Sequence, residues 1–122
     1  MRRSKDIETA LYELLKESHY SASAHALPAT LGKALPHVHV VRTGGYEDDM
    51  VIEVNQIDFD TYAFDAADAM EHASALCGWI RDLADSEYYV SKITTLPYSN
   101  PDPRHPSLAR VTVKAQILTR TV

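Results

Sequence analysis

Cysteine is almost absent from this sequence, which contains Cys77 and no other cysteine among its 122 residues. An intrachain disulfide and a cysteine-based zinc site are therefore both excluded. Long apolar runs are also lacking, and no stretch approaches the roughly 18 apolar residues that a membrane-spanning helix requires. The first residues are basic like the start of a signal peptide, but Glu8, Glu13 and Lys16 interrupt the apolar segment that would have to follow. We expect a soluble protein without a cleaved signal or a membrane span.

Basic residues are outnumbered by acidic ones. The chain has 12 Lys and Arg against 17 Asp and Glu, for a formal net charge of −5. This balance argues against sequence-independent binding of nucleic acid, because that binding depends on clustered Lys and Arg. Hydrophobic residues make up 45% of the chain, which is enough for a folded core. The length suits a single domain over residues 1–122.

Apolar periodicity predicts two helices and four strands. Apolar residues recur at helical spacing over 5–18 and again over 66–84, where many of them are alanine. Ser4 or Asp6 is suited to cap the first helix, and Asp65 the second. Alternating β-branched and aromatic residues predict strands over 37–43, 50–63, 88–96 and 108–121. The apolar phase changes inside 50–63, which predicts a bulge or break near Asn55–Gln56.

Three segments between these elements read as connectors. Residues 21–36 are rich in small side chains, with one helical turn expected over 29–34, and residues 44–49 combine two glycines with three acids. Residues 97–106 hold four prolines in ten positions and are predicted to be irregular. The order α-β-β-α-β-β predicts an α+β fold, with an antiparallel or mixed sheet of about four strands and both helices on one face.

Asp58 and Asp60 alternate with apolar residues on a predicted strand. Residues two apart on a strand lie about 6.5–7 Å apart, a separation that some carboxylate pairs in hydrolases use. Their apolar neighbours face the other way, so we expect both acids on a solvated or subunit-facing side of the sheet. Arg110 and Lys114 have matching spacing on the last strand. Ion pairing across strands or subunits is therefore the preferred interpretation of this acidic face.

His37 and His39 form the sharpest metal-binding pattern, because His-x-His on a strand places both imidazoles on one face. A third ligand is required, and the sequence does not place His19, His25 or His72 beside them. A metal-dependent hydrolase using His37, His39 and Asp58 is therefore an alternative of low weight. We predict no metal and no cofactor.

The remaining reactive residues give no catalytic constellation. Cys77 falls in the apolar stripe of the second helix and reads as a buried hydrophobe. Trp79 lies at the edge of the same stripe and is assigned to the core, with a partner-facing position as the alternative. No phosphate-binding loop and no nucleophile elbow occurs. We therefore expect that the protein is not an enzyme.

The order of the predicted helices and strands and one segment of the sequence resemble those of a known family. A leading helix "DIETALYELLKE" is followed by "LPHVHVVRTGG", an acidic loop, and "DFDTYAFDAADAMEHA" from Asp58 to Ala73. A proline-rich loop and a long strand close the chain. This arrangement resembles the tail terminator (tail completion) proteins of long-tailed bacteriophages, in which a strand ending in an aromatic residue and Ala precedes an acid and an Ala-rich helix. The resemblance covers nearly the whole chain through pattern and length.

The resemblance implies a virion assembly protein of phage or prophage origin without catalytic residues. Such proteins form a ring, which stops growth of the tail tube and joins tail to head. The resemblance implies a hexamer, with a monomer in isolation as the alternative. The implied partners are further copies of the chain, the major tail tube protein and the head–tail connector, with DNA passing through unbound and no membrane involved. The implied location is the virion tail or neck, after assembly in the host cytoplasm.

Mobile turns and sheet edges are the expected sites of subunit contact. The candidate contact residues are Gly44, Gly45, Tyr46, Glu47, Asp48, Asp49, Tyr98, Asn100, Arg104, Arg110 and Lys114. Asp58 and Asp60 form the candidate acidic face, and either they or Glu47–Asp49 could line a bore. Another small protein of the head–tail junction is the main alternative function.

Overall fold

A computed structural model describes residues 6–48, 52–83 and 90–120. The described chain contains two α-helices, a single turn of 3₁₀ helix and one sheet of five strands. The elements follow in the order α1 (Ile7–Glu17), β1 (Ala22–Ala24), η1 (Leu31–Lys33), β2 (His37–Glu47), β3 (Ile52–Ala63), α2 (Ala66–Asp82), β4 (Val90–Ser99) and β5 (Ala109–Arg120). The α+β class is confirmed.

Both helices begin where the sequence places an acidic cap. Asp6 accepts a hydrogen bond from the backbone N–H of Thr9, and Asp65 accepts one from the N–H of Asp68. Each carboxylate therefore satisfies an N–H group that the first helical turn leaves free. Neither helix in the described part of the chain is long and apolar enough to cross a membrane.

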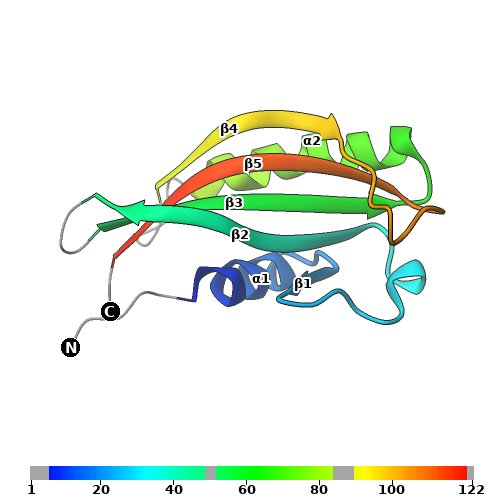
Figure 1. Cartoon of the computed structure of the whole chain (residues 1–122), viewed down its shortest axis with the longest axis horizontal. Coiled ribbons are helices and arrows are strands. Elements are labelled where there is room, and N and C mark those ends of the chain that lie inside the picture. The colour runs from blue at the N-terminus through cyan, green and yellow to red at the C-terminus, as the bar shows by residue number, and fades with distance from the viewer. Residues whose placement is uncertain (1–5, 49–51, 84–89, 121–122) are drawn as a thin grey trace.

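The sheet has the strand order β1-β2-β3-β5-β4. The four long strands pair antiparallel, whereas the short β1 pairs parallel with β2 through Ser23 and His39. Figure 1 shows β1 beside α1, next to the beginning of β2. The sheet is therefore mixed and has five strands, one more than the four that the sequence predicted, and β1 falls inside the segment expected to be a connector.

Both helices cover the same face of the sheet. Ile7, Leu11 and Leu15 of α1 join one buried cluster with the alanine-rich stripe of α2. The cluster also includes alternate residues of three strands, namely Val38, Val40, Ile57, Phe59, Ala63, Val111, Val113, Ala115 and Ile117. The opposite face of the sheet, which we call the open face, has no helix over it among the described residues.

Two predictions about loops and irregularities are wrong. Gly44 to Glu47 belong to β2, and Pro97 to Ser99 belong to β4, although both segments were expected to be irregular. The register shift lies on β2 between Arg42 and Gly44, whereas β3 pairs with β5 without interruption through Asn55–Gln56. The apolar phase of β3 changes because different stretches of this strand bury different faces. The extra residue of the register shift lies on the neighbouring strand, β2. Asp49 lies outside the described residues.

Candidate functional site

The open face carries most of the polar side chains of the sheet, and they form cross-strand rows. Strand pairing places His39 opposite Asp60 and Asp60 opposite Thr112. The next row places His37 opposite Tyr62 and Tyr62 opposite Arg110. Both rows lie at the end of the sheet where β2 begins and β3 ends, which is the right-hand end in Figure 1.

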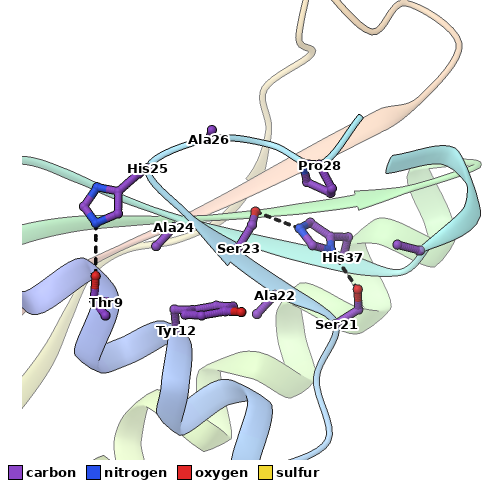
Figure 2. A pocket seen from close by; sticks show the side chains of 11 residues that line it. Thr9, Tyr12, Ser21, Ala22, Ser23, Ala24, His25, Ala26, Pro28 and His37 are labelled. Atoms are coloured by element: carbon purple, nitrogen blue, oxygen red, sulfur yellow. Dashed lines mark hydrogen bonds between the residues drawn. The ribbon is translucent and has the colours of Figure 1, made fainter. Parts of the chain in front are cut away.

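A chain of serine and histidine side chains joins β1 to β2. The hydroxyl of Ser21 lies 2.7 Å from Nδ1 of His37, and the hydroxyl of Ser23 lies 2.8 Å from Nε2 of the same ring. The Ser23 hydroxyl also lies 2.7 Å from Nδ1 of His39. Figure 2 shows the imidazole of His37 between the two serines. Both nitrogens of His37 thus have partners, whereas Nε2 of His39 has no hydrogen bond among the described residues.

Burial keeps both histidines neutral at physiological pH. His37 is 2% exposed and His39 is 9% exposed. Burial, together with the charge of nearby His39, lowers the pKa of His37 to about 4. Burial also lowers the pKa of His39, although the charges of Asp60 and Glu8 act in the opposite direction. A neutral imidazole has one donor and one acceptor nitrogen, so Nε2 of His39 accepts toward the open face in the tautomer whose Nδ1–H donates to Ser23, and donates in the other tautomer.

Asp60 is a buried carboxylate on the open face of the sheet, so the prediction of a solvated side chain is wrong for this residue, whereas a subunit-facing position stays a prediction. It is 7% exposed. Its Oδ1 accepts a hydrogen bond of 2.7 Å from the hydroxyl of Thr112, and no hydrogen bond reaches Oδ2 within the described ranges. Burial raises the pKa of Asp60, against the hydrogen bond from Thr112 and the charge of Arg110. The group is desolvated without a directly bound cation, which is an expensive arrangement for a carboxylate.

Asp58 has a different environment although it lies only two residues away. Both of its oxygens accept hydrogen bonds of 3.1 Å from the Lys114 ammonium group. The predicted ion pairing across strands is therefore confirmed for this pair. Hydrogen bonding to Asp58 raises the pKa of Lys114. With the Lys114 side chain 40% exposed, such a pair contributes about 1 kcal/mol or less to stability.

Asp102, in the loop between β4 and β5, organises a second polar cluster. Its Oδ2 accepts a hydrogen bond of 2.8 Å from the Tyr62 hydroxyl and lies 3.0 Å from Nδ1 of His105. The guanidinium of Arg110 lies 3.7 Å from the same oxygen. Burial alone would raise the pKa of Asp102, but hydrogen bonds from Tyr62, from the backbone N–H of Arg104 and from His105 lower it to about 2. Asp102 is therefore a compensated buried anion.

These groups surround a cleft with a volume of about 530 Å³. His39, Asp60, Tyr62 and Arg110 from the sheet line it, together with Arg104 and His105 from the β4–β5 loop. The loop after β1 supplies the facing wall with His25, Ala26, Leu27, Pro28 and Ala29, and Val41 completes the lining. The cleft thus combines a polar floor with partly apolar walls, and its size suits one long side chain or a small ligand.

A second hollow of about 470 Å³ lies between β1, its following loop and α1. His25 is positioned at this hollow by contacts with α1. Its Nε2 lies 3.0 Å from the Thr9 hydroxyl, and its Nδ1 lies 3.0 Å from a carboxylate oxygen of Glu8. Figure 2 shows His25 facing Thr9 across this hollow. Both nitrogens of His25 are engaged, so this ring holds the loop in place and adds no free ligand to the cleft.

The structure separates the candidate contact residues into free and engaged side chains. Tyr46 is 57% exposed, and the Arg104 side chain is 88% exposed. In contrast, Arg110 donates to the carbonyl oxygen of Asn100 at 2.6 Å, and Lys114 is paired with Asp58. Glu47 and Asp48 are exposed at the end of β2, whereas Tyr98 lies on β4 opposite Thr112.

The metal-binding alternative proposed on sequence used His37, His39 and Asp58, and these groups do not converge. His37 has serine partners on both nitrogens, and Asp58 is bound to Lys114. Within the described residues no group of three or more His, Cys, Asp or Glu side chains is arranged to hold a metal ion. The acid that lies opposite His39 is Asp60.

The interpretations of the second helix agree with the structure. Cys77 is buried as a free thiol in the core. Trp79 is partly buried against the core, where its ring lies 6.2 Å from those of Tyr20 and Phe59. Its indole N–H donates to the Ser18 hydroxyl at 3.0 Å. This bond joins α2 to the end of α1.

Sequence reasoning missed Ser21, Ser23, Thr112, Asp102 and His105 as members of the site. The serines alternate only with alanine, which is a weak strand former, and Asp102 sits among prolines, so no strong local pattern marks them. Alternation on β5 did place Thr112 on the same face as Arg110 and Lys114. This shared face was the one signal in the sequence that the neutral Thr112 could be the partner of an acid on the neighbouring strand.

Comparison with known proteins adds no family assignment. No protein-family model matches the chain, and no curated protein matches it either.

Proposed function

We propose that this protein is a tail terminator of a long-tailed bacteriophage or prophage, which forms a ring that caps the tail tube and joins it to the head. The protein then acts by shape and association without catalysis. The proposal begins from the resemblance in sequence, and four features of the structure support it.

The observation that carries the proposal is the path of the chain from β3 into α2. β3 ends at Tyr62 and Ala63, Asp65 caps the next helix, and α2 then packs its alanine stripe on the same sheet. This is the strand, acid and Ala-rich helix of the resemblance, formed as one continuous unit. It lies within the order of helices and long strands expected for such a protein, with β1 added at the edge.

The two ends of the sheet present different surfaces, which suits a ring. At one end, where β2 ends and β3 begins, Tyr46, Glu47 and Asp48 are exposed. The other end has the polar cleft between the β1 loop and the β4–β5 loop. A ring requires contacts between two different patches on each subunit, and a molecule with unlike ends can supply them.

The edges of the sheet also favour selective association over open-ended strand pairing. β4 is an edge strand with two register shifts and contains Pro97. Such irregularities hinder addition of further strands. Its exposed Leu96 and the exposed Phe64 before α2 remain available as isolated apolar contacts.

The charge of the chain fits a channel for DNA. Six copies, each with a formal charge of −5, would carry about −30 at neutral pH. A bore lined by acids repels DNA and lets it slide through without specific binding. Glu47 and Asp48 are the exposed acids at the hairpin end, whereas Asp60 is buried and is not a candidate for the bore.

The test is assembly of the purified protein alone and with the tail tube protein encoded beside it. Light scattering and negative-stain images are expected to give a ring of six subunits, either alone or on the end of the tube. A strict dimer that forms no ring beside tube protein would contradict the proposal. A ring that binds the head connector but not the tube would indicate another protein of the head–tail junction.

A pair of variants makes the test specific to the hairpin end. Tyr46→Asp places a charge on an exposed aromatic residue of β2 and is expected to reduce ring formation at least tenfold. Met70→Asp, at a half-exposed apolar position on α2, is the matched control and is expected to assemble like the wild type. Equal assembly of both variants would exclude Tyr46 from the contact.

A further inference from the structure

Asp60 is the feature of the cleft that the fold itself does not explain. Asp58 has Lys114 as a bound cation, and Asp102 has Arg110 within 3.7 Å. Asp60 is as deeply buried as these groups, yet no basic nitrogen lies within ion-pairing distance of it in the described part of the chain. Among the residues that the structure describes, only Thr112 donates to it, and none of them donates to the oxygen Oδ2. A buried carboxylate with a free oxygen in a cleft is a binding group for a donor from outside.

The two arginines of the cleft do not fill this role. Arg110 directs its Nε to the carbonyl of Asn100 at 2.6 Å and its NH2 to that of Pro101 at 3.4 Å. Arg104 extends into solvent, and its Nε lies 3.9 Å from Asp102. Both guanidinium groups are thus oriented by the β4–β5 loop, and the position beside Asp60 is open to another cation.

The walls of the cleft define the rest of the ligand. Leu27, Pro28 and Val41 offer apolar contact above a floor that contains Asp60 and His39. An aliphatic stem would contact these walls while its charged end reaches the carboxylate. The Nε2 atom of His39 has no hydrogen-bond partner among the described residues, and it is a second acceptor in the tautomer whose Nδ1–H donates to Ser23.

We propose that this cleft binds the end of a basic side chain, an alkyl guanidinium or alkyl ammonium group, with Asp60 as its acceptor. The inference concerns the chemistry of the cleft and holds whether or not the protein forms a ring.

The binding test uses two small probes of the same shape and different charge. N-acetyl-arginine amide is titrated into ¹⁵N-labelled protein, and N-acetyl-citrulline amide, which carries a neutral urea group, is the matched ligand. The arginine probe is expected to give saturable shifts at the amides of Leu27, His39 and Asp60. The citrulline probe is expected to bind about tenfold more weakly, because a charge-assisted hydrogen bond is roughly twice as strong as a neutral one. Equal binding of the two probes, or no binding of either, overturns the proposal.

Variants separate a binding role of Asp60 from a structural one. Asp60→Asn keeps the acceptor for Thr112 and removes the buried charge. It is expected to lose the preference for arginine and to raise the melting temperature of the free protein by about 3–5 °C. Asp58→Asn is the matched control two residues away, and it is expected to keep the preference without raising the melting temperature. A lower melting temperature for Asp60→Asn would identify the carboxylate as a structural group and sink the proposal.

A third variant leaves Asp60 untouched. Arg104→Gln removes the exposed cation at the rim, which repels or competes with the ligand, and is expected to tighten binding of the arginine probe about threefold. Weaker binding in this variant would contradict the assigned charge of the ligand.

Light scattering over a range of concentrations then identifies the source of the ligand: if Asp60→Asn dissociates the assembly that the wild type forms, the ligand comes from a second copy. An unchanged oligomeric state points to a different protein.

Discussion

The buried imidazole of His37 makes the stability of this protein depend on pH in a defined way. The ring is enclosed between Ser21 and Ser23 and is 2% exposed. Burial lowers its pKa from 6.5 to about 4. The perturbation to apply is a decrease of pH from 7.5 to 4, with the wild type compared with His37→Gln.

The sign follows from counting protons in the two states. Between pH 6.5 and about 4, the unfolded chain binds a proton at His37 and the folded protein does not. The free energy of unfolding therefore falls as pH falls through this window, and the full contribution is present above pH 6.5. At about 1.36 kcal/mol for each pKa unit, the lowering of the His37 pKa corresponds to about 3 kcal/mol. This is an upper value, because local opening would admit water to the ring.

Other groups titrate near the same window and need separation. His39 has a lowered pKa and contributes with the same sign. Asp60 contributes with the opposite sign, because its raised pKa means that the folded protein holds a proton that the unfolded chain has lost. Asp102, with a pKa of about 2, loses its stabilising effect only below the usual 3.8. Asp60 and Asp102 contribute in both proteins, so the difference between wild type and His37→Gln reports His37 together with its charge coupling to His39.

The assay is urea unfolding followed by circular dichroism at half-unit steps of pH. The wild type is expected to lose about 1.4 kcal/mol more per pH unit than His37→Gln between pH 6 and pH 4.5. His72→Gln, which changes a half-exposed histidine of α2 away from the serine–histidine chain, is the control for the loss of one histidine. Identical slopes for wild type and His37→Gln would refute the assignment of this pH dependence to the buried ring.

Three further substitutions test the packing and the polar contacts. Gly45→Ala brings a Cβ into the backbone oxygen of Val54 and should lower the free energy of unfolding by about 1–3 kcal/mol, whereas Gly44→Ala meets open space and should change it by less than about 1 kcal/mol. Tyr62→Phe removes the donor to Asp102 and should cost about 1.5–3 kcal/mol in urea unfolding at pH 7, with a smaller cost at pH 2, where about half of the Asp102 carboxylate is protonated in the folded protein. Thr61→Val should stabilise the protein by about 1 kcal/mol, because the Thr61 hydroxyl is buried without a partner in the described structure, and a loss of stability would contradict this.

Periodicity predicted the helices and the long strands because their burial follows from local pattern. The stripe of α1 ends up buried as Ile7, Leu11 and Leu15, and the alanines of α2 pack closely on the sheet. Each of these elements buries one face. A single buried face makes apolar residues recur in the sequence with the period of the helix or strand. The caps Asp6 and Asp65 were predictable for a similar reason, since a cap acts within four residues.

β1 could not be predicted because its stability comes from its neighbour. Its three residues, Ala22 to Ala24, alternate alanine with serine, but the stretch is short and has low strand propensity. The strand forms because β2 offers a free edge, and because Ser23 reaches two histidines of that strand. These contacts span 14 and 16 residues of sequence and leave no local signal.

The prediction of a turn at Gly44–Gly45 is wrong because it took the two glycines as a sign of backbone flexibility. What matters in the structure is that glycine has no side chain. The β2–β3 hairpin continues through both glycines to Glu47. At Gly45 the space that a Cβ would need is occupied by the Val54 carbonyl and by the guanidinium of Arg42. Arg42 in turn donates its Nε–H to Asn55 at 2.9 Å. Glycine is required there for close approach within a strand, which local composition does not distinguish from a turn.

The contrast between Asp58 and Asp60 depends on strand register, which the sequence left undetermined. β5 offers Arg110, Thr112 and Lys114 in succession on the open face, and β3 offers the two acids at the same spacing. A register two residues away in one direction would pair Asp60 with Lys114, and in the other direction with Arg110. The observed register instead places Lys114 beside Asp58 and the neutral Thr112 beside Asp60. The apolar residues of the opposite face fix this choice through the packing of the core, so the fold itself decides which carboxylate is neutralised within the chain and which one is left for a ligand.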